Sequence, residues 1–86
     1  MAYDPWKDVS DEDLFTRRSD AEFKLALASI IQAPIAAFIV KYADVPGMAS
    51  LLAIFQRAVD TYAFLIEKYT SIIAALTAEL KSRGLV

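Results

Sequence analysis

The chain has 86 residues, a formal net charge of −2 and an apolar share of 57%. A chain of this length forms one small domain, near the lower limit of what a single hydrophobic core can support. Cysteine and histidine are both absent, which excludes disulfides and the usual zinc and haem ligands. Soluble domains are typically only about 45–50% apolar. We therefore expect association with further copies, or with a larger complex, to complete the core.

Charge is unevenly distributed along the chain. Residues 1–22 carry seven acidic and three basic side chains, whereas residues 23–86 carry four acidic and six basic ones. The acidic segment is either a solvated terminus or an arm that lies on the more basic body of a neighbouring copy. No basic stripe is present, so no nucleic-acid partner is expected. The chain lacks asparagine and has only two glutamines, a composition typical of proteins from hot environments.

Residues 1–18 are predicted to form an N-terminal arm with a short helix. Ser10 precedes three acidic residues. Serine is a preferred N-cap residue, and acidic side chains in the first turn interact favourably with the helix dipole, so a helix over 11–18 is expected. Trp6 lies either over this helix or between neighbouring hairpins, because aromatic residues with a polar group are enriched at contact centres. Ser19 and Glu22 then form a capping box. The helical hairpin is therefore predicted to occupy residues 19–86.

The first long helix, predicted over about 20–42, contains an uncharged run at residues 25–40 between Lys24 and Lys41. A helix that is apolar around most of its circumference is buried on several sides or lies against lipid. The run is shorter than the roughly 20 residues that span a bilayer. We expect it to contact neighbouring copies or lipid, with Leu27, Ile31 and Phe38 as candidate contact residues.

Two residues interrupt this run. Pro34 has no N–H to donate and crowds the carbonyl of Ile30, so one kinked helix is predicted, with two shorter helices as the alternative. Gln32 is a polar side chain among apolar ones. It either finds a buried partner and fixes the register of a contact, or lies at a boundary with access to water or backbone.

The segment Asp44-Val45-Pro46-Gly47 is the strongest helix breaker in the chain. A turn at 43–46 makes the flanking helices antiparallel neighbours. The second helix is predicted over about 47–82, with Gly84 just beyond its C-terminus. It is roughly 50 Å long, a length that suits an array of helices. The fold class expected is an all-α helical hairpin, completed by oligomeric packing.

Ten apolar residues follow each other in the second helix at alternating spacings of four and three, which places them on one side. This first apolar row comprises Met48, Leu52, Phe55, Val59, Tyr62, Ile66, Tyr69, Ile73, Leu76 and Leu80. A second apolar row beside it comprises Leu51, Ala58, Leu65 and Ile72. Phe64 interrupts the polar opposite side, either as an anchor for a neighbour or as a single exposed aromatic. The first row, Phe64 and Trp6 are candidate assembly contacts.

No catalytic constellation is present. Without histidine or cysteine, no nucleophile–base pair is apparent, and two glycines cannot form a phosphate-binding loop. Asp11, Glu12 and Asp13 lack the alternating ligands and the glycine of an EF-hand, so they are expected to complement the helix dipole. We expect no enzymatic activity, cofactor or metal.

A motif runs through residues 46–80, in which a Pro-bearing turn precedes a helix with a Leu-rich start, a Gln, a later Tyr and a Ser in an aliphatic run. The positions are Pro46, Leu51, Leu52, Gln56, Tyr62, Ser71, Ile72 and Ile73. This motif resembles the C-terminal half of type III secretion needle and inner-rod subunits. The resemblance implies a hairpin that polymerises into a hollow filament, with its second helix inside the wall. Apolar helical hairpins also build conjugative pili and filamentous virus coats.

These observations predict a non-enzymatic structural subunit that self-assembles in many copies into a filament, tube or virion-like shell. The alternative is a small helical accessory subunit of a membrane or multiprotein complex, with residues 25–40 against lipid. A discrete regulatory oligomer is a third possibility. No signal peptide is expected, because an acidic segment follows Met1. The location would be an extracellular filament, a virion or a membrane-associated complex.

Overall fold

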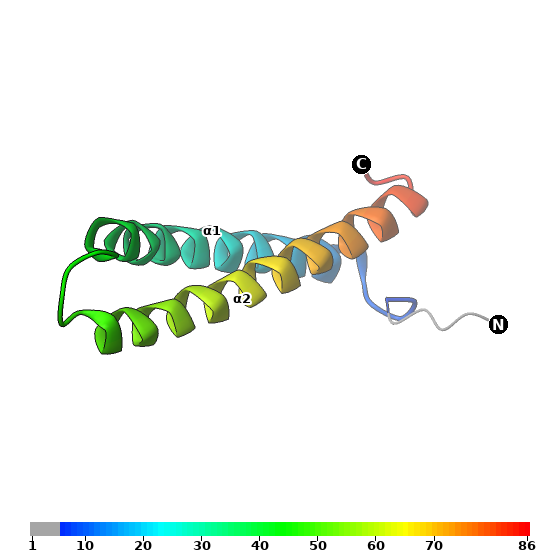
Figure 1. Cartoon of the computed structure of the whole chain (residues 1–86). Helices are drawn as coiled ribbons and strands as arrows, with labels where there is room; N and C mark the ends of the chain where they lie inside the picture. Colours follow the sequence, from blue (N-terminus) through cyan, green and yellow to red (C-terminus); the bar gives the residue numbers. More distant parts are fainter. Residues whose placement is uncertain (1–5) are drawn as a thin grey trace.

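Two long antiparallel helices, joined by a short turn, make up most of the molecule (Figure 1). The structure is a computed structural model, and it describes residues 6–86. Helix α1 spans Asp11–Tyr42 and helix α2 spans Ala49–Ser82, and no strand occurs within the described range. The predicted all-α hairpin is confirmed. Its radius of gyration is 18.1 Å, against about 12 Å for a compact domain of this length, so the hairpin is a thin rod.

Helix α1 begins earlier than predicted, and the expected boundary between an arm helix and the hairpin is wrong. Ser10 is its N-cap and accepts a hydrogen bond from the Asp13 amide, at 3.1 Å. The helix then continues through the capping box at Ser19, so residues 11–18 belong to α1. No residue between the two caps breaks a helix, and an ion pair at 3.1 Å joins Arg18 to Glu22 across the predicted boundary.

Pro34 lies inside α1, which remains one helix through Tyr42. The prediction of a single helix is therefore confirmed, and the alternative of two helices is wrong. Pro34 itself is exposed. Its ring lies away from α2, so the missing backbone donor does not disturb the contact between the helices.

The turn occupies residues 43–48, two residues more than predicted. Gly47 has a φ of +83°, a left-handed conformation that cannot belong to an α-helix, so α2 begins at Ala49. The C-terminal end at Ser82 agrees with the prediction. Gly84 has a φ of +74°, and Leu85 donates to the Leu80 carbonyl at 2.9 Å. These are the marks of a Schellman C-cap.

The helices contact each other along most of their length. The residues on the covered side of α1 follow each other at alternating spacings of four and three, as do those of the first apolar row of α2. This pattern is typical of coiled-coil packing. Its members are Leu14, Arg18, Ala21, Leu25, Ala28, Gln32, Ile35, Ile39 and Tyr42. Among the described residues, only Leu14, Ala21, Ala28, Leu76 and Leu80 are buried. Two helices alone leave most apolar side chains half-covered.

The tightest packing lies at the open end of the hairpin, opposite the turn. Leu14, Leu76 and Leu80 are fully buried there, with Trp6 and Val9 packed against them. This cluster holds the segment before α1 onto the last turns of α2.

Candidate interaction surfaces

The first apolar row is the inner face of the hairpin. Leu76 and Leu80 are buried, and the other eight members are half-buried. The partner surface that this row requires is therefore α1 of the same chain. Two aromatic side chains show the contact directly, since the ring centroids of Phe38 and Phe55 are 4.8 Å apart. Phe38, a candidate for contacts between copies, also packs on Tyr42 at 4.4 Å.

The outer face of α1, opposite α2, is apolar and uncharged between residues 25 and 40. Helical spacing places Ile30 and Ala37 at its centre, with Phe23 on the same side just before it and Val40 beside them. The exposed fractions of Phe23, Ile30 and Val40 are 67%, 69% and 78%. Monomeric soluble proteins rarely expose a contiguous apolar face of this kind.

The outer face of α2 has a different character. Arg57, Asp60, Glu67 and Lys68 are all exposed there. Phe64 lies among these charges with 66% of its surface exposed. The structure therefore leaves Phe64 uncovered within its own hairpin, as either sequence interpretation requires. The hairpin therefore has an apolar outer face on α1 and a charged outer face over residues 57–68 of α2.

Trp6 is half-buried against its own chain, beside the cluster of buried leucines. The guanidinium of Arg17 lies 5.8 Å from its ring centroid. Of the two positions predicted for Trp6, the structure shows intramolecular packing. The expected contact of the arm with a second copy remains a prediction, and residues 1–5 of that arm lie outside the described range.

Arg83 forms hydrogen bonds that join the chain segments at this end of the hairpin. Its guanidinium donates to the carbonyls of Trp6 and Val9 at 2.8 and 2.7 Å, and to the carboxylates of Asp11 and Glu79 at 2.8 and 2.9 Å. The hydrogen bond to Asp11, followed by that to Glu79, raises the pKa of Arg83 above its ordinary value. One side chain thus joins the segment before α1 to the end of α2.

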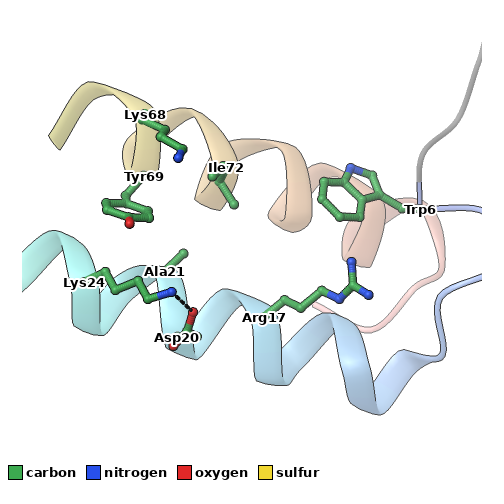
Figure 2. A pocket seen from close by; sticks show the side chains of 8 residues that line it. All are labelled: Trp6, Arg17, Asp20, Ala21, Lys24, Lys68, Tyr69 and Ile72. Carbon is green, nitrogen blue, oxygen red and sulfur yellow. Dashed lines mark ion pairs between the residues drawn. The ribbon is translucent and has the colours of Figure 1, made fainter. Parts of the chain in front are cut away.

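A depression of about 300 Å³ opens between the helices near this end (Figure 2). Trp6 and Tyr69 supply two aromatic rings, and Arg17, Lys24 and Lys68 supply three cations. The ammonium groups of Lys24 and Lys68 lie 5.9 and 5.7 Å from the centroid of the Tyr69 ring. Cations at this distance from a ring are attracted by its negative face.

The three cations of this depression differ in their partners. Lys24 forms an ion pair with Asp20 at 2.9 Å, and that hydrogen bond raises the pKa of Lys24. Arg17 and Lys68 make no ion pair with any side chain between residues 6 and 86. The depression therefore carries excess positive charge in a protein whose net charge is −2.

A second depression of about 300 Å³ adjoins the first and shares Lys24 and Tyr69 with it. Its remaining lining is apolar or aromatic and comes from both helices: Leu27, Ala28, Ile31, Tyr62 and Leu65. Leu27 and Ile31, which were expected to contact other copies or lipid, thus line a concave surface. Leu65 and Ile72 of the second apolar row line the two depressions. We call the continuous surface the side groove.

Sequence reasoning missed the side groove, although its components were visible. Arg17, Lys24 and Ile31 recur every seven residues, as do Leu65 and Ile72. Such repeats predict a common side of each helix. The pairing of the two sides depends on the register between the helices, which the structure shows.

Both helices are long and apolar enough to cross a membrane by length and composition. Few residues of either qualifying segment are buried within the hairpin. Within residues 6–86 there is no group of three or more acidic residues placed to hold a metal ion. Comparison with protein-family models, with curated proteins and with solved structures finds no match to this chain.

Proposed function

We propose that this protein is a non-enzymatic structural subunit that self-assembles in many copies through the outer face of α1. The observation that carries the proposal is the exposed, uncharged surface around Phe23, Ile30 and Val40. The sequence resemblance to needle and inner-rod subunits supports the same class of function, a hairpin that forms a filament or tube.

The unequal sides of the hairpin define how copies would pack. Packing through α1 would bury the apolar side, while the charged side of α2 would stay in water. The accessible surface of 6213 Å² supports such packing, because a compact monomer of 9.5 kDa exposes only about 5,000 Å². Burial of apolar surface is the main driving force of association.

The experiment is negative-stain electron microscopy of the purified protein, with light scattering on the same sample. The substitution Ile30→Asp places a charge at the centre of the proposed interface, on a side chain that the hairpin itself leaves exposed. We expect this variant to keep the helical circular-dichroism signal of the wild type but to remain unassembled. Ser71→Asp, on the outer face of α2, is the matched control and should assemble normally.

Two results would contradict the proposal. A wild type that forms only a monomer or small discrete oligomer across the concentration range tested would exclude assembly in many copies. Assembly of Ile30→Asp as complete as that of Ser71→Asp would show that the outer face of α1 is not an interface.

A second candidate function, that of an accessory subunit in a membrane complex, is favoured by the length and hydropathy of both helices. The distribution of polar groups weighs against a single membrane-spanning hairpin. Gln32 contacts the Val59 carbonyl, so Gln56, Arg57 and Asp60 lie level with the middle of the apolar run of α1. Charged groups at the centre of a bilayer are costly unless they face protein or water.

Flotation with liposomes separates the two functions. Protein that floats with liposomes, and needs detergent for solubility, would support the membrane role. Assemblies that form in detergent-free buffer and sediment without liposomes would support the structural role.

A further inference from the structure

The side groove combines two chemical environments in one continuous surface. Its end near Trp6 is cationic and aromatic, and its other end is apolar. Lys24 and Tyr69 line both parts, so the two parts adjoin at these side chains. A molecule that matches this surface needs an anionic group joined to an apolar chain.

The cationic end is suited to a phosphate group. Arg17 and Lys68 lie on opposite helices and are not neutralised by a carboxylate of residues 6–86. Figure 2 shows the Arg17 side chain near Trp6, and Lys68 and Lys24 on either side of Tyr69. Lys24 and Lys68 approach the Tyr69 ring from two helices and can donate to different oxygens of one phosphate, whereas Arg17 lies two turns of α1 away, beside Trp6. The carboxylate of Asp20 also lines this end and is paired with Lys24.

The apolar end is suited to a hydrocarbon chain. Ile31 and Leu65 are half-buried between the helices, and Leu27 forms the exposed rim. A chain lying here would cover side chains that the hairpin alone leaves in contact with water. Removal of that apolar surface from water favours binding.

We propose that the side groove binds an anionic phospholipid, with its phosphate between Lys24 and Lys68, its headgroup toward Arg17 and its acyl chain along Ile31 and Leu65. The bound lipid lies lengthwise on the hairpin, one molecule per subunit. This inference is independent of the assembly proposal, since the groove lies between the helices of one chain and does not include Phe23, Ile30 or Val40.

Trp6 provides the measurement, because it is the only tryptophan of the chain and lines the groove. Lysophosphatidylglycerol is titrated into the protein below its micelle-forming concentration, and the Trp6 emission is recorded. We expect a saturable change at one lipid per chain. Lysophosphatidylcholine of the same chain length should bind more weakly, because its headgroup carries no net charge. Glycerol phosphate, which lacks the chain, should leave the spectrum unchanged.

The variant for this test is the double substitution Arg17→Gln with Lys68→Gln. Both side chains belong to exposed residues, so the helical circular-dichroism signal should be retained. Affinity for lysophosphatidylglycerol should fall about tenfold, as expected for the loss of one partly solvated ion pair and of a second nearby cation. Lys81→Gln, which removes a cation outside the groove, is the control and should bind as the wild type does.

Four results would overturn the proposal. Equal affinities for the two lysolipids would show that the groove does not recognise the anionic headgroup. Equal binding of glycerol phosphate would show a site for free phosphate. Unchanged affinity in the double variant would exclude the assigned cations, and no saturable binding of any probe would exclude the lipid site.

Discussion

Gln32 shows how a single polar residue is accommodated between two apolar helices. Its side-chain amide donates to the Val59 carbonyl of α2 at 3.0 Å, across 27 residues of sequence. Gln32 is half-buried and its partner is a backbone carbonyl, so the structure shows the boundary position with access to backbone. The bond lies midway along the hairpin and joins one position of α1 to one position of α2. Gln32 therefore helps to fix the register between the helices.

The contribution of Gln32 is testable with two substitutions of similar size. Gln32→Leu removes the donor but keeps the packing, and the Val59 carbonyl retains its bond within the helix. We expect the free energy of unfolding to change by no more than about 1 kcal/mol. Gln32→Glu places a carboxylate against the carbonyl and should destabilise the hairpin by about 1–3 kcal/mol. Urea unfolding followed by circular dichroism distinguishes these outcomes, and equal losses would show that the hydrogen bond is unimportant.

At the level of the element, α1 carries two capping motifs, of which only one is used. Ser10 and Ser19 both precede acidic residues and look equivalent in the sequence. Only the first caps the helix, because Leu14 is buried against Leu76 and Leu80 of α2. This contact stabilises helical structure before Ser19. It involves residues more than sixty positions apart, and local sequence patterns do not contain such information.

Pro34 is the weakest point of α1. Proline in a helix interior costs about 3 kcal/mol relative to alanine, and Pro34 is exposed on the side away from α2. We therefore expect Pro34→Ala to stabilise the hairpin, by up to about 3 kcal/mol in urea unfolding. A variant no more stable than the wild type would show that Pro34 does not lower the stability of the helix. Ala37→Ser, on the same face, is a control for the exchange of one small exposed residue for another.

For the whole molecule, the sequence predicted α2 better than α1. The first apolar row of α2 contains no polar residue, so its spacing could be read directly. The matching row of α1 includes Arg18, Gln32 and the small residues Ala21 and Ala28, which hide the same spacing. The side groove could not be predicted, because it depends on the register between the helices. That register is visible only in contacts such as Phe38 with Phe55.

Because a two-helix hairpin has a single interface, damage to that interface affects the whole fold. Ile66 is half-buried in the middle of the first apolar row. Ile66→Asp places an unpaired charge between the helices at a cost of about 2–4 kcal/mol, comparable with the total stability of so small a domain. We expect loss of the helical circular-dichroism signal and of assembly, whereas Ser71→Asp should retain both. A stable, assembled Ile66→Asp protein would show that the row is not covered in solution.

The open end of the hairpin has a mechanical consequence. The segment before α1 and the segment after α2 meet at Arg83, whereas the turn lies at the far end of the rod. A force that pulls these two segments apart acts across the helix pair and peels it open from one end. The Arg83 contacts and the buried leucines carry the load first, and the Gln32 bond carries it later. Contacts loaded one after another yield at lower force than contacts loaded together, so the hairpin would be weak in this direction. A force applied along the rod, with one handle at the turn, would instead act along a single helix and its backbone hydrogen bonds.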